Sequence, residues 1–175
     1  TLRDYTNAKE AFYAIINKES KYTAPATYYY AHVAYLEKNY ETALKAFSKL
    51  LTNESYSKIA PYYIVQIYYF QQKYDEIIAF ALSLLDSANN KRAPEIARIA
   101  AEAYYHTERY ESALPYLENY LLKNTIPLTR EDYYMIAYTY YKVKDYKNAI
   151  DYFDKISTTA NDSLTQLTYY HLAQS

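Results

Sequence analysis

The chain of 175 residues contains no cysteine and no glycine. Without cysteine it has no disulfides, no thiolate metal ligands and no cysteine nucleophile. Without glycine it cannot contain the phosphate-binding loop of nucleotide hydrolases, the dinucleotide-binding fingerprint, the kinase glycine loop or the nucleophile elbow, because each needs a backbone position without a side chain. The absence of glycine also favours helices joined by short turns over β-hairpins, whose tight turns usually need it.

An excess of charge of either sign is missing as well. The 19 lysines and arginines nearly balance the 20 aspartates and glutamates, which gives a net charge of -1. Proteins that bind nucleic acids or anionic lipids usually carry a clustered excess of basic residues, which this chain lacks. Its longest apolar runs are also far below the ~18 residues that cross a bilayer. We therefore expect no nucleic-acid partner and no membrane insertion by this segment. The sequence does not distinguish a cytoplasmic location from one in the periplasm or cell envelope, because a lack of cysteine suits both.

Tyrosine is abundant, with 28 residues, and it marks an internal repeat. The markers, at intervals of 35, 34, 36 and 36 residues, are Tyr5, Tyr40, Tyr74, Tyr110 and Tyr146. Three residues after them stand Ala8, Ala43, Ile77, Ala113 and Ala149, and four residues further on stand Phe12, Phe47, Ala81, Leu117 and Phe153. A repeat of this period decides the architecture, because units that cannot bury an apolar face alone must stack on their neighbours.

Within each unit the apolar positions recur at three and four residues, which is the period of an amphipathic helix. The predicted helices are 4–18, 27–37, 40–51, 61–72, 74–85, 94–107, 110–122, 130–143, 146–156 and 166–175. Pro25, Pro61 and Pro94 are expected in first turns, where no amide donor is needed, and Thr129 with Asp132 predicts a capping box. Pro115 is expected to delay the start of its helix or to kink it.

The repeat columns resemble those of the tetratricopeptide repeat, a pair of helices per ~34 residues. Small residues stand where the family's helices cross, at Ala31, Val65, Ala101 and Ala137, and the family's tyrosine column holds Tyr68, Tyr104 and Tyr140. The family's turn glycine is replaced by Lys38, Gln72, Glu108 and Lys144. The resemblance implies an all-α fold of about ten helices: a right-handed α-solenoid of stacked antiparallel hairpins whose first helices line the concave face.

The resemblance also implies a single array over residues 1–175. Its parts are the second helix of a partial repeat at 1–20, repeats at 24–57, 58–91, 94–127 and 130–163, and the first helix of a truncated repeat at 166–175. An array that opens on a second helix and stops within a first one predicts an excerpt of a longer protein. Abundant Tyr, Lys, Asn and Ile indicate an AT-rich, bacterial coding sequence.

The first helix of each unit carries a second stripe, which its own hairpin does not need. This stripe holds Tyr28, His32, Tyr35, Tyr62, Gln66, Tyr69, Arg98, Glu102, Tyr105, Tyr134, Tyr138 and Tyr141. Tyrosine suits recognition because it offers a large, stiff contact area with a hydroxyl at its tip. We predict that the stripe lines a groove for a peptide or protein. The sequence leaves open the alternative that these rings only pack against neighbouring first helices.

More specific chemistry is not supported. Chaperone-binding members of the family clamp a C-terminal carboxylate with Lys, Asn and Arg on three successive first helices. Those places hold Tyr28, His32, Tyr63, Glu95 and Ile99 here or, one unit later, Tyr62, Gln66, Ile99, Glu131 and Met135. This segment is therefore predicted to lack the clamp. Glu102 and His106 are interpreted as a helix-surface pair, since a structural zinc site needs four ligands.

We accordingly expect no catalytic residue, no metal and no cofactor, and predict a non-catalytic scaffold that binds a protein or peptide partner. Two alternatives remain open. One is a peptide-sensing regulatory segment of a bacterial signalling protein. The other is a component of cell-envelope assembly.

Overall fold

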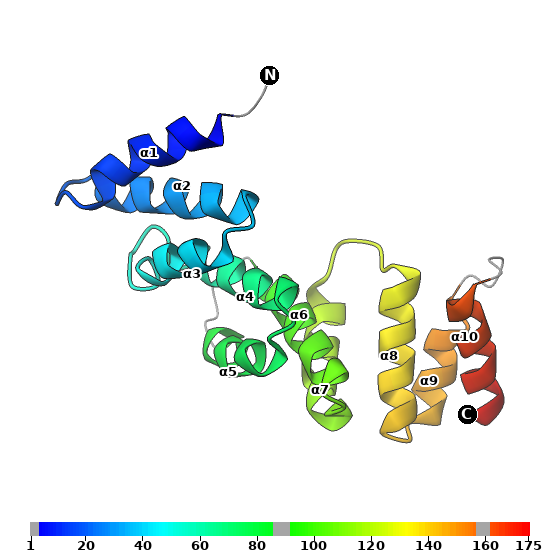
Figure 1. The fold of residues 1–175 in the computed structure, drawn as a ribbon. Coiled ribbons are helices and arrows are strands. Elements are labelled where there is room, and N and C mark those ends of the chain that lie inside the picture. The colour runs from blue at the N-terminus through cyan, green and yellow to red at the C-terminus, as the bar shows by residue number, and fades with distance from the viewer. Residues whose placement is uncertain (1–3, 86–91, 157–161) are drawn as a thin grey trace. The chain divides into compact units, whose positions relative to one another are not determined.

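The computed structural model describes residues 4–85, 92–156 and 162–175, which form ten α-helices and no strand (Figure 1). The helices are α1 (Tyr5–Ile16), α2 (Thr23–Leu36), α3 (Tyr40–Ser48), α4 (Ala60–Phe70), α5 (Tyr74–Leu85), α6 (Ala93–His106), α7 (Tyr110–Lys123), α8 (Arg130–Lys142), α9 (Tyr146–Phe153) and α10 (Ser163–Gln174). The predicted all-α class is confirmed. None of these helices is long and apolar enough to cross a membrane.

Several helix boundaries differ from the predicted ones. α2 begins four residues earlier than predicted, at Thr23, so that Pro25 becomes its third residue. α10 begins three residues early because the Asp162 side chain accepts the N–H of Thr165 and caps the helix at that point. α3 and α9 end about one turn earlier than predicted. Proline nevertheless occupies first turns as expected, since Pro61 and Pro94 are the second residues of α4 and α6.

Pro115 does not delay the start of its helix, so that part of the expectation was wrong. α7 begins at Tyr110 and contains Pro115 in its interior. The carbonyl of Arg109 accepts the N–H groups of Ser112 and Ala113 over 3.1 Å each, so the first turn closes before the proline ring is reached. Because Pro115 has no N–H, the carbonyl of Glu111 lacks its helical hydrogen-bond donor. Glu111 is exposed, so water can hydrogen-bond to this carbonyl. The predicted capping box of α8 is confirmed, with Thr129 and Asp132 bonding reciprocally.

One turn type ends α2, α4, α6 and α8. Lys38, Gln72, Glu108 and Lys144 take φ values of 59°, 55°, 58° and 66°, the left-handed region that favours glycine. After α2, the N–H of Lys38 donates to the Tyr35 carbonyl over 2.9 Å, and that of Asn39 to the Ala34 carbonyl over 2.8 Å. These are the bonds of a Schellman motif, and the same pair recurs after the other three helices. Four residues that carry a Cβ thus all take a backbone conformation that glycine adopts more readily.

The chain divides into two compact units, residues 1–93 and 94–175, each with its own core. In unit 1, consecutive helices from α1 to α5 pack against one another, and Phe47, Ile64 and Ile67 lie in the core to which α2, α3 and α4 contribute. In unit 2, α8, α9 and α10 lie side by side (Figure 1). Leu117 and Phe153 are fully buried in this unit. The repeat columns supply these cores: Ala43, Ile77, Ala113 and Ala149 have no exposed surface.

Candidate functional site

The twelve residues of the predicted stripe lie on α2, α4, α6 and α8, three on each helix, and every one is half-buried. Spacings of four and three residues place the three members on one face of their helix. The structure gathers them into two groups, one in each unit. We call the group on α2 and α4 the unit 1 cluster and the group on α6 and α8 the unit 2 cluster.

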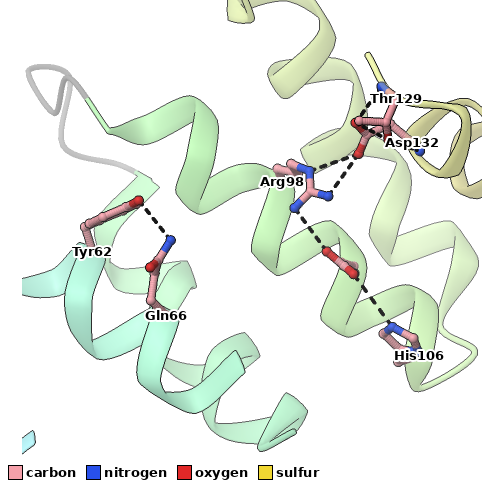
Figure 2. Close-up of polar contacts among 7 residues, drawn as sticks. Tyr62, Gln66, Arg98, His106, Thr129 and Asp132 are labelled. Carbon is pink, nitrogen blue, oxygen red and sulfur yellow. Dashed lines mark hydrogen bonds and ion pairs between the residues drawn. The ribbon is translucent and has the colours of Figure 1, made fainter. Parts of the chain in front are cut away.

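A side-chain hydrogen-bond chain links the two helices of the unit 1 cluster. The hydroxyl of Tyr35 on α2 donates to Oε1 of Gln66 on α4 over 2.8 Å. Nε2 of Gln66 in turn donates to the hydroxyl of Tyr62 over 2.8 Å, the bond drawn in Figure 2. Gln66 therefore uses both ends of its amide. Tyr69 lies at the end of α4 beside Phe70, with ring centroids 6.2 Å apart. The chain of bonds fixes the orientation of the Tyr35 and Tyr62 rings.

The centre of the unit 1 cluster is Tyr63, which the predicted stripe omits. Its ring stacks on Phe47 with centroids 4.7 Å apart and planes 2° from parallel. The rings of Tyr28, His32 and Tyr35 meet it edge-on at 6.1, 5.4 and 5.3 Å. Tyr63 therefore links the predicted residues of α2 to the hydrophobic core.

Burial determines the protonation of the unit 1 cluster. It raises the pKa of both Tyr28 and Tyr35, and a hydrogen bond to Tyr63 raises the pKa of Tyr28 further. Burial lowers the pKa of His32. The hydroxyls are therefore neutral at physiological pH and the imidazole is biased towards its uncharged form. The α2 side of the unit 1 cluster is thus aromatic and uncharged, whereas the guanidinium of Arg92 lies over the ring of Tyr62 on α4, 4.8 Å from its centroid.

The unit 2 cluster has a charged part, built around Arg98 on α6. Nε and Nη2 of Arg98 each lie 3.0 Å from Oδ1 of Asp132 on α8, and Nη1 donates to Oε2 of Glu102 over 3.3 Å (Figure 2). The other carboxylate oxygen of Glu102 lies 3.9 Å from Nε2 of His106. All three nitrogens of the guanidinium thus face carboxylates of its own unit.

Asp132 is 5% exposed and serves two structural roles. While Oδ1 receives Arg98, Oδ2 accepts from the backbone N–H and the hydroxyl of Thr129, each over 3.0 Å, which completes the capping box of α8. The sequence predicts the capping box from local spacing. It gives no indication of the partner on α6, which lies 34 residues away along the chain.

A pocket of about 220 Å³ opens beside this charged part. It is lined by Arg98, Glu102, Tyr105, His106, Glu131, Asp132, Tyr134, Met135 and Leu164. The lining comes from α6, α8 and α10, so the pocket lies wholly within unit 2. We call it the unit 2 pocket.

The aromatic part of the unit 2 cluster surrounds His171 on α10, another residue outside the predicted stripe. The ring of Tyr138 contacts those of Tyr105 and Tyr134 at 5.8 and 5.9 Å. His171 is 9% exposed, and its ring lies 4.9 Å from Tyr138 and 5.1 Å from Tyr141. These contacts join α10 to the tyrosines of α8.

Burial sets the ionisation of these groups too. It raises the pKa of Tyr134 to about 12 and also raises that of Tyr105. Burial and the nearby charge of Lys142 lower the pKa of His171. The Lys142 ammonium itself lies over the rings of Tyr110 and Tyr138, at 5.4 and 5.8 Å from their centroids. Tyrosine rings of this unit therefore already bind one cation.

Both missed residues stand in the same column of the repeat. Tyr63 and His171 each lie two positions before the small-residue column, at Val65 and Ala173, and the same place holds the buried Ile99 and Met135 in the units between them. In the first complete unit, however, this column holds Tyr29, which is 51% exposed. The column alone would therefore not have distinguished Tyr63 and His171 from an exposed tyrosine.

Comparison with protein-family models and with curated protein sequences finds no match, so the clusters are interpreted from their own geometry. Within the described ranges, no three or more His, Asp or Glu side chains come together in a way that could bind a metal ion.

Proposed function

We propose that the chain is a non-catalytic scaffold that binds a peptide or protein partner through the unit 1 and unit 2 clusters. The observation that carries the proposal is a contrast in burial along the same helices. The cores contain fully buried residues of these helices, such as Ala31, Ile64 and Ile136, whereas all twelve residues of the stripe keep part of their surface exposed. Contiguous exposed aromatic surface is typical of interaction sites.

The tetratricopeptide-like solenoid is part of the same proposal. Its support is the recurrence of one left-handed Schellman turn at the same repeat column, after α2, α4, α6 and α8. A turn that recurs at intervals of 34, 36 and 36 residues reverses the chain in the same way each time. We infer that α2 with α3, α4 with α5, α6 with α7 and α8 with α9 are equivalent hairpins, and that their first helices line the concave face of a right-handed array.

The side chains of both clusters are suited to recognition because they are ordered before a partner arrives. Tyr35, Gln66 and Tyr62 fix one another by hydrogen bonds, and Tyr134, Tyr138 and Tyr141 are held by ring contacts. A partner therefore loses little affinity to the ordering of side chains, which for a free rotamer-rich residue costs about 0.5–1.5 kcal/mol. A hydroxyl whose proton is already donated within the chain, such as that of Tyr35 to Gln66, can still accept a hydrogen bond from a peptide N–H.

Peptide display on the immobilised chain tests the proposal, followed by mapping of the best peptide by backbone NMR. We expect enriched peptides whose addition shifts the amide resonances of α2 and α4, or of α6 and α8. Shifts confined to α3, α7 and α9, or a library that shows no enrichment over an uncoated support, would contradict it.

A further inference from the structure

The unit 2 pocket has the size of a receptor for one side chain. Its volume of about 220 Å³ is below the ~300–1,000 Å³ typical of pockets for drug-sized ligands. Two rings, Tyr105 and Tyr134, and two aliphatic side chains, Met135 and Leu164, form its apolar part. A pocket with these walls accepts a long side chain that ends in a polar group.

The charges around the unit 2 pocket determine the sign of that polar group. Three carboxylates line it, those of Glu102, Glu131 and Asp132, against the single guanidinium of Arg98. Arg98 already forms hydrogen bonds with Asp132 and Glu102, so its guanidinium does not present a pair of unused N–H donors to an incoming anion. The net negative field disfavours a carboxylate or phosphate and favours a cation.

The aromatic walls narrow the choice among cations. Ammonium and guanidinium groups are both attracted to the face of a tyrosine ring, as Lys142 over Tyr110 and Tyr138 shows within the same unit. A guanidinium is also flat, is weakly hydrated and can pair bidentately with a carboxylate, which an ammonium cannot do. Glu131, exposed in the first turn of α8, supplies a carboxylate at the pocket.

We propose that the unit 2 pocket binds the guanidinium of an arginine side chain in the peptide partner, against Tyr105 and Tyr134 and paired with Glu131. The inference deepens the proposed peptide-binding function and rests on it. It assigns an aromatic contact to the unit 1 cluster and an arginine contact to the unit 2 pocket.

The test titrates the whole chain with N-acetyl-arginine methylamide and follows amide resonances by NMR. The control ligand is N-acetyl-citrulline methylamide, which has nearly the same shape without the charge. We expect arginine to shift resonances of α6 and of the start of α8, and to bind about tenfold more tightly than citrulline, the ratio that 1.4 kcal/mol of charge-dependent interaction provides. Equal binding of the two compounds, or an absence of shifts in unit 2, overturns the proposal.

A matched pair of variants locates the charge. Glu131→Gln removes the carboxylate at the pocket, whereas Glu111→Gln makes the same change in the exposed first turn of α7, away from the pocket lining. We expect Glu131→Gln to weaken arginine binding about fivefold or more and Glu111→Gln to leave it unchanged. Equal affinities in both variants reject the pairing. If display-selected peptides still bind the tyrosine clusters while arginine does not bind, the further inference fails and the proposed function stands.

Discussion

Arg98 on α6 donates Nε to Oδ1 of Asp132 on α8 over 3.0 Å, and the same carboxylate closes the N-terminal capping box of α8. One buried side chain therefore starts a helix and joins two first helices of unit 2. Neither function leaves a free acceptor, because the second oxygen is occupied by Thr129. The stability of unit 2 and the shape of its pocket should both depend on Asp132.

Asp132→Ala is predicted to destabilise the chain by about 3 kcal/mol. Loss of an N-terminal cap costs about 0.5–2 kcal/mol, and breaking an ion pair with a buried carboxylate costs more because Nε and Nη2 of Arg98 lose their acceptor. Urea denaturation followed by circular dichroism measures the change. Glu111→Ala, an exposed first-turn carboxylate of α7, should lie within about 0.5 kcal/mol of the wild type. Similar losses for the two variants would show that Asp132 acts only as another surface charge.

Glycine is predicted to stabilise each left-handed turn. Lys38 has φ 59°, which costs a residue with a Cβ about 1 kcal/mol that glycine does not incur. Lys38→Gly should therefore raise the melting temperature by about 2–4 °C, and the same change at Gln72, Glu108 or Lys144 should act alike. Lys45→Gly, at an exposed site inside α3, should lower it by a similar amount. A fall in melting temperature for all four turn variants would contradict the turn geometry.

Acidification is predicted to weaken unit 2 through His171. Its pKa is lowered in the folded chain by burial and by Lys142, so between that value and the ordinary value of ~6.5 the unfolded chain binds more protons. The contribution is complete above pH ~6.5 and is lost as pH falls through the lowered pKa. The free energy of unfolding at pH 8 and pH 5 measures it. His171→Phe, which keeps a ring beside Phe153, should reduce the pH dependence. Identical pH dependence in wild type and His171→Phe would refute this role.

Local patterns predicted the helices well because their signals are local. Amphipathic spacing and the tyrosine markers predicted the first residues of α3, α5, α7, α8 and α9, and the capping box of α8 was visible in Thr129 and Asp132. The early start of α10 depends on a cap at Asp162 that lies outside the apolar pattern.

The membership of the clusters was less predictable because it depends on contacts between helices. The stripe through Tyr62 omits Tyr63, since neighbouring residues point about 100° apart on a helix, yet Tyr63 makes the central contacts. Tyr56 lies between α3 and α4, in a segment without helical periodicity, and its ring stacks on that of Tyr28 with centroids 4.9 Å apart. Helical spacing placed Arg98 on the stripe, but only the fold brings Asp132 to it.

The central claim is that the half-exposed tyrosines bind a partner and do more than pack. The most direct test measures the affinity of one display-selected peptide by calorimetry for two double variants. Tyr62→Ala with Tyr134→Ala removes one ring from each cluster. Tyr22→Ala with Tyr169→Ala removes one exposed ring from each unit, at residues 59% and 56% exposed.

The account predicts that the cluster variant, still helical by circular dichroism at the temperature of measurement, binds the peptide about tenfold or more weakly, a loss of about 1.4 kcal/mol. The control variant should bind like the wild type. Unchanged affinity in the cluster variant, accompanied by a large fall in its melting temperature, would show that these rings only pack and would contradict the account.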